Sequence, residues 1–220
     1  MNHEESLNQA INLRGEFWNK VGELEQDFLT PIINPSFQGG PQWPSFRQSW
    51  RIIKREKTTI LASDGLSDPY EDMDTNPKVS AFNGFGLEFF IESPDEFDSI
   101  KSWQFDLIFQ ASQWAAMEGN LINKIKHFEY ISSELHDVKV PEQFKNSEGR
   151  VGVFVGLQGE VPRSLKLPNE TISIVNVKLL TRKELDFLAS GDNDARLKLL
   201  ELFIKQGHPT YSSLERESVI

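Results

Sequence analysis

Apolar residues recur at steps of three and four near the start of the chain, and this spacing predicts a helix over residues 5–29. The positions that form its apolar face are Leu7, Ile11, Phe17 or Trp18, Val21, Leu24 and Phe28. Pro31 and Pro35 end the pattern, and the segment NPSFQGGPQWPSF that follows reads as a loop because it is dense in Pro and Gly. Residues 1–35 are therefore expected to form an N-terminal helix and lead-in.

Short strand patterns follow this loop. The runs 49–55 and 58–63 are rich in β-branched and aromatic residues and are separated by a charged turn, which predicts a hairpin. The strictest alternation lies in residues 84–92, with Phe85, Leu87, Phe89 and Ile91 on one face and Glu88, Phe90 and Glu92 on the other. Because Phe90 lies on the second face, both faces of this strand are expected to be covered.

The second half of the chain alternates between the two periodicities. Helical spacing predicts a helix over 100–118 with Gly119 as its C-cap, and a helical or mixed segment over 121–135. Two strands are predicted, at 150–157 and 171–180. Thr181 and Glu184 have the spacing of a capping box, which predicts the start of a helix, and a last helix is expected before Gly207.

Strand patterns thus cluster, and helical patterns cluster after them. This order predicts the α+β class, with helices packed on a mixed, largely antiparallel sheet. No internal repeat or long linker divides the chain, so residues 1–220 are interpreted as a single domain.

Composition and charge narrow the classes of partner. The net charge is −10, from 33 acidic and 23 basic residues, so binding of nucleic acid or of an anionic membrane is not expected, whereas a basic protein partner is favoured. The chain has no cysteine, which excludes disulfides, zinc–thiolate sites and thiol nucleophiles. With no signal-like N-terminus and no apolar run long enough to span a bilayer, a cytoplasmic protein is expected.

The motifs of catalysis and cofactor binding do not occur. The chain has no phosphate-binding loop, its four histidines lack metal-ligand spacing, and no GxSxG elbow appears. The glycines of NGFGLE precede a strand rather than a helix, so a tight turn is the favoured interpretation. No catalytic residue, cofactor or metal is therefore expected.

An acidic loop before the strongest strand leaves three interpretations open: a metal site, a catalytic carboxylate cluster, or a surface that meets another protein. Its acidic residues are Asp64, Asp68, Glu71, Asp72 and Asp74. Their spacing does not match a calcium-binding loop, and the number of carboxylates alone does not define a catalytic pair. Trp103 and Trp114 are eleven residues apart on one helical face, which suits the core or a groove for a partner.

Several segments resemble the Suppressor of fused family, in its N-terminal type of domain. The resemblance is strongest in DGLSDPY followed by NGFGLEFFIE. It continues in FQASQWAAME, in ISIVNVKLLTRKELDFLASGDNDARLKLLE and in HPTYSSLERESV, and so covers most of residues 40–218.

This resemblance implies an α+β domain that binds proteins and catalyses nothing. Animal members clamp an extended peptide of a transcription factor as a strand between two domains, whereas similar bacterial members are grouped as immunity proteins that neutralise a cognate toxin. Trp114 looks like an aromatic residue that helps to hold the peptide. Ile125, Lys126 and His127 stand where the family has an acidic contact, so a different partner is expected here.

We therefore expect a non-enzymatic, bacterial immunity-type protein that binds a protein partner such as a basic toxin domain. The residues expected to contact the partner are Asp68, Tyr70, Glu71, Asp72 and Trp114. Asp68 and Tyr70 are also expected to hold the acidic loop against the sheet. The alternatives are a regulatory module that binds a peptide by strand addition at a sheet edge, and a hydrolase that uses carboxylates of residues 64–74.

Overall fold

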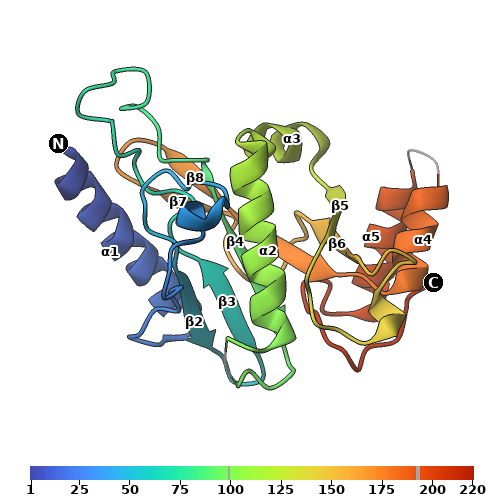
Figure 1. Cartoon of the computed structure of the whole chain (residues 1–220). Coiled ribbons are helices and arrows are strands. Elements are labelled where there is room, and N and C mark those ends of the chain that lie inside the picture. Colours follow the sequence, from blue (N-terminus) through green and yellow to red (C-terminus); the bar gives the residue numbers. More distant parts are fainter. Residues whose placement is uncertain (99, 192–193) are drawn as a thin grey trace.

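The computed structural model describes residues 1–98, 100–191 and 194–220, in which a mixed sheet carries helices on both of its faces (Figure 1). The strands are β1 (Glu23–Leu24), β2 (Trp50–Lys54), β3 (Thr59–Ser63), β4 (Leu87–Ser93), β5 (Ile131–Leu135), β6 (Val151–Val155), β7 (Ser164–Lys166) and β8 (Thr171–Leu179). They lie in the order β1-β2-β3-β4-β8-β6-β5, and β7 pairs with β8 outside this path. Among the strands of the described residues, only β4 and β8 pair in parallel, so the predicted mixed, largely antiparallel sheet is confirmed.

In the described part of the chain, five α-helices surround this sheet. They are α1 (His3–Val21), α2 (Trp103–Glu118), α3 (Leu121–Phe128), α4 (Arg182–Ser190) and α5 (Ala195–Gln206), with 3-10 turns at η1 (Pro35–Gln38) and η2 (Glu142–Phe144). Figure 1 shows α1 and α2 beside the β2–β4 half of the sheet, and α4 and α5 beside β6.

The two faces of β4 pack against different helices. Phe89 lies in the large core cluster that contains Leu107 and Ile108 of α2. Phe90 lies in a second cluster, with Trp18 of α1, and the two rings are 6.0 Å apart in an edge-to-face arrangement. The prediction that both faces of this strand are covered is therefore confirmed.

Local signals explain most helix ends. The Thr181 side chain accepts from the backbone N–H of Glu184 while Glu184 accepts from the N–H of Thr181, which is the capping box predicted from the sequence. Gly119 closes α2 in the left-handed region, also as predicted. At the start of α1, Asn2 and Glu5 form a second capping box, so the helix begins at His3, before the predicted start at residue 5.

The first helix ends at Val21, eight residues before the predicted end at residue 29. A Cβ at Gly22 would lie 2.6 Å from the carbonyl oxygen of Lys54, so the chain passes against β2 at this glycine. Leu24 then pairs with Ile53 as part of β1 instead of continuing the helix.

Two other predicted elements also have different bounds. The strand predicted from residue 84 begins at Leu87, because Gly84 and Gly86 have φ values of 54° and 72°, which belong to a turn rather than a strand. The mixed segment 121–135 divides into α3 and β5, and the chain reverses at Glu129, whose φ is 59°. The short strand β7 was missed because three residues carry too little pattern to be recognised.

Candidate functional site

The acidic loop between β3 and β4 is divided between the interior and the surface. Asp64 and Asp68 are fully buried, whereas Glu71, Asp72 and Asp74 are exposed. The two groups therefore have different partners and different chemistry.

The buried aspartates are bound by arginines from α1 and from the segment around β2. Arg14 donates from Nε to Asp64 Oδ1 at 2.8 Å and also bonds to Asp68. Arg47 donates from Nη2 to Asp64 at 2.6 Å and to Asp68 at 2.9 Å. Arg51 binds the other oxygen of Asp64. The N-terminal helix is thus joined to the acidic loop by charged groups.

Glu88 of β4 is the third carboxylate of this cluster. Its Oε1 accepts from the backbone N–H groups of Gly65 and Ser67 at 3.0 and 2.9 Å, and from the Ser67 hydroxyl at 2.6 Å. Ser63 of β3 donates to its other oxygen, and Arg14 Nε lies 3.9 Å from Oε1. The arginine–carboxylate network, defined here as Arg14, Arg47, Arg51, Asp64, Asp68 and Glu88, therefore holds three cations and three anions.

The charges in this network act against the effect of burial. Burial alone would raise the pKa of Asp64, but the charges of Arg14, Arg47 and Arg51 outweigh it and hold that pKa well below its usual range. Burial raises the pKa of Glu88, with the charge of Arg14 opposing it. Because these side chains are enclosed and neutralised, the network is suited to joining α1, the loop and the sheet rather than to binding a substrate.

Arg14, which binds both buried aspartates, was not predicted from the sequence to meet the acidic loop. Its spacing in the sequence, four residues after Ala10 and three before Phe17, places it on the buried face of the first helix. An arginine on such a face needs a buried counter-charge, and two aspartates of the acidic loop provide it. The sequence gives no distance between residues 50 and 54 positions apart, so their pairing could not be identified from it.

The predicted partner-contact residues lie in three different environments. Asp68 is directed into the network, with its Oδ2 accepting from Ser45 Oγ at 2.7 Å, and this fits the expectation that it holds the loop. Tyr70 is half-buried and meets Phe85 edge to face, with 6.4 Å between the ring centroids. Glu71 and Asp72 are at the surface.

Trp114 of α2 packs against β4. Its ring stacks on Phe89 with 6.4 Å between centroids and 7° between planes, and its side chain is half-buried. Trp103, the other tryptophan of this helix, is buried in the core. Partner contact by Trp114 stays a prediction.

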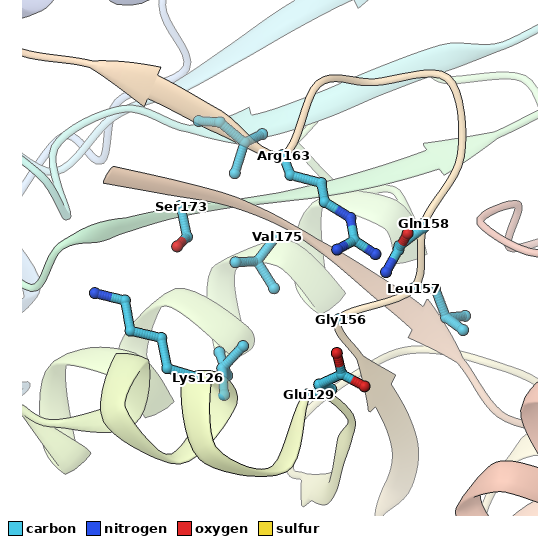
Figure 2. Close-up of a pocket in the computed structure, with 10 residues that line it drawn as sticks. Lys126, Glu129, Gly156, Leu157, Gln158, Arg163, Ser173 and Val175 are labelled. Carbon is cyan, nitrogen blue, oxygen red and sulfur yellow. The ribbon is translucent and has the colours of Figure 1, made fainter. Parts of the chain in front are cut away.

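A cavity of about 240 Å³ lies beside β8, next to the loop that connects β6 to β7 (Figure 2). Arg163 and Gln158 reach it from the connecting loop, and Lys126 and Glu129 reach it from α3 and the residue after it (Figure 2). Lys126 occupies the region where the resemblance implies an acidic contact, so this cavity carries two cations and one carboxylate.

A second buried ionic group lies at the C-terminal segment. The capping residue Glu184 also accepts from Arg216 Nη1 at 2.7 Å and from the backbone N–H of Val219 at 3.1 Å. The nearby amine of Lys178 donates to the carbonyl of Tyr211. Burial, assisted by the charge of Arg216, lowers the pKa of Lys178 to about 7.

Within 1–98, 100–191 and 194–220, no group of three or more His, Asp or Glu side chains is placed to hold a metal ion. Over these same stretches, no helix combines the length and the apolar character needed to cross a membrane.

These features define a class of protein: an α+β domain whose mixed sheet is covered on both faces and whose acidic loop is held by buried arginines. The sequence matches no family model, and no curated protein matches it significantly. Solved structures do match in three dimensions, and they belong to Suppressor of fused.

Two of these structures are similar over nearly the whole chain. The structure of the Sufu-Fu complex matches with a TM-score of 0.55 and 14% identity, over 97% of this chain and 92% of that one. Drosophila Suppressor of Fused matches with a TM-score of 0.53 and 15% identity, over 97% of this chain and 51% of that one. The chain thus spans about half the length of the Drosophila chain. This likeness confirms the Suppressor of fused fold that the sequence motifs implied.

Proposed function

We propose that this protein works by binding another protein and is not an enzyme. The observation that carries this proposal is the fold, which is similar to that of Sufu in the Sufu-Fu complex. More specifically, we propose a bacterial, cytoplasmic immunity-type protein that occludes and neutralises a cognate toxin domain, as the resemblance of its motifs implies.

The charge of the chain supports a basic partner. With a net charge of −10, its field attracts cationic surfaces and raises the rate of encounter with them. The buried network holds three cations and three anions, so the excess of acidic residues lies outside it. A basic toxin domain is the partner class that such a surface favours.

The hydrolase alternative receives little support from the loop that motivated it. Two of the five loop carboxylates, Asp64 and Asp68, are enclosed and bound to arginines, so they are closed to a substrate. A general acid or base must be within hydrogen-bond reach of the group that it protonates or deprotonates.

The proposal is tested by co-expressing the protein with the product of the adjacent gene. Pull-down of that product and rescue of growth would support it, and failure to bind or protect against neighbouring toxins would count against it. Salt screens the attraction between opposite charges, so the association rate should fall as ionic strength rises from about 50 to about 500 mM. Over this range the Debye length shortens roughly threefold.

Strand addition is the second candidate, and the end of the sheet favours it. β5 is a terminal strand in the order of the sheet, and among the described residues it pairs only with β6. Its outer edge is therefore suited to accept an extended peptide. Hydrogen exchange in the complex separates the two candidates, because strand addition would add protection to those amides of Ile131–Leu135 that face away from β6.

A further inference from the structure

The exposed carboxylates of the acidic loop lack the arginine partners that the buried ones have. Among the described residues, Glu71 and Asp72 form no ion pair, whereas Asp64 and Asp68 share Arg14 and Arg47. The loop therefore presents two uncompensated charges to its surroundings.

These two charges lie at a cavity with aromatic walls. The cavity has a volume of about 320 Å³ and is lined by Trp43, Pro44, Tyr70 and Phe85 together with Glu71 and Asp72. Gln42 completes the lining, and among the described residues no Lys, Arg or His takes part in it. Aromatic faces and carboxylates both attract a cation, and together they suit a guanidinium or an ammonium group.

Hydrogen bonds hold the acidic wall of this cavity in place. Glu71 Oε1 accepts from the backbone N–H of Phe46 at 3.2 Å, while the N–H of Glu71 donates to the carbonyl of Pro44 at 3.1 Å. Asp72 Oδ2 accepts from Asn76 Nδ2 at 2.9 Å. The carboxylates are thus positioned before any ligand binds, which lowers the entropy lost on binding.

The Tyr70 hydroxyl reports the sign of the local potential. Burial raises the pKa of Tyr70, and the charges of Glu170 and Asp72 raise it further. Both carboxylates therefore lie close enough to act on the wall of the cavity, and their field favours a positive ligand.

Apolar side chains are exposed beside the cavity. Phe46 is 51% exposed next to Glu71, and Phe37 is 76% exposed in the turn that Asn34 caps. Asn34 also donates to the carbonyl of Phe46, so the two segments are in contact. Exposed aromatic side chains beside a charged cavity are typical of a surface that another protein covers.

We propose that this cavity binds one Lys or Arg side chain from a basic segment of a protein partner, while an apolar residue next to it packs on Phe46. The inference rests on the proposed protein-binding function and assigns it a surface and a chemistry. The volume of about 320 Å³ lies at the lower end of the roughly 300–1,000 Å³ range of pockets for drug-sized ligands, so one long side chain can be accommodated.

A small probe tests the cavity without a partner. The probe is acetyl-Phe-Arg-amide, titrated into the ¹⁵N-labelled protein, and its matched control is acetyl-Phe-citrulline-amide, which keeps the shape but lacks the charge. Saturable shifts at the Trp43 indole and at the amides of Tyr70 and Phe85 are expected for the arginine probe only. The absence of saturable shifts there, or equal shifts with citrulline, would overturn the proposal.

Two double variants give the matched protein comparison. Glu71→Gln with Asp72→Asn should weaken binding of the arginine probe about tenfold, because two charge-assisted contacts are lost. Glu16→Gln with Glu201→Gln removes the same charge from exposed positions on α1 and α5 and should leave binding within about twofold. Equal weakening in both would show a general field effect and would refute a specific site.

The same variants separate this inference from the proposed function. If the adjacent gene product is captured but its affinity is unchanged by the Glu71 and Asp72 substitutions, the cavity proposal fails and the protein-binding function stands. If the arginine probe binds at the cavity but no neighbouring product is bound, the immunity function fails and the cation site stands. Thermal unfolding checks that each variant is folded.

Discussion

Replacing Arg14 with methionine should destabilise the fold strongly. The substitution keeps an unbranched side chain of moderate length but removes the donors that reach Asp64, Ser67 and Asp68. Two buried aspartates would then share the remaining arginines, Arg47 and Arg51. Breaking a buried ion pair by removing one partner costs about 3–5 kcal/mol, a large part of the roughly 5–15 kcal/mol that stabilises a domain.

Urea denaturation followed by circular dichroism measures this loss as a change in the free energy of unfolding. Arg150→Met is the matched control, because Arg150 pairs with Glu134 and Glu148 at the surface. Such an exposed pair contributes about 0–1 kcal/mol, so the control should change little. If Arg14→Met is no more harmful than Arg150→Met, the network does not hold α1 to the loop and the reasoning is wrong.

A second measurement localises the effect. Hydrogen exchange should show that the amides of α1 and of residues 64–68 lose protection together in Arg14→Met, because the arginine–carboxylate network joins them. Loss of protection in α5, which lies in a different core cluster, would instead indicate general unfolding.

Three further predictions follow from single residues. The pKa of Asp64 in the folded protein lies below its unfolded value of about 3.9, so its contribution to stability is present above that value and is lost as pH falls toward the folded pKa. Urea titrations between about pH 6 and about pH 2 should show this decline in the free energy of unfolding, and a flat profile would contradict it. Gly84→Ala should lower the melting temperature by several degrees, because Gly84 has a φ of 54° and a Cβ would lie 2.4 Å from the carbonyl oxygen of Leu66, whereas Gly149→Ala, with a φ of 76° in open space, should lower it less. Lys178 has a pKa of about 7 in the folded protein, below its unfolded value of about 10.4, so the unfolded state binds more protons between these two values. Stability should therefore rise with pH across this window. Lys178→Met should remove the rise, and an unchanged slope of unfolding free energy against pH would refute the assignment.

Local patterns in the sequence were sufficient to identify most elements. The alternation around Phe89 and Phe90 predicted a strand with two covered faces, and the capping box of Thr181 and Glu184 predicted the start of α4. These signals could be recognised because side-chain periodicity and capping bonds involve residues only a few positions apart. The family motifs likewise predicted the fold that the similar solved structures show.

Long-range pairing was decided by the tertiary structure alone. β4 pairs in parallel with β8, although all the elements from α2 to β7 lie between these two strands in the sequence. In the same way, the acidic loop appeared in the sequence as five equivalent carboxylates, and only the folded chain divides them. Arg14 reaches Asp64 and Asp68 across 50 and 54 residues and neutralises them, while Glu71 and Asp72 stay uncompensated at the surface.

The physical reason is the range of the interactions involved. A helix or strand is set by hydrogen bonds and side-chain contacts between near neighbours, and the order of residues records these directly. The partner of a buried charge depends on the path of the whole chain through space, and the desolvation energy that makes such a partner necessary exists only once the chain has folded.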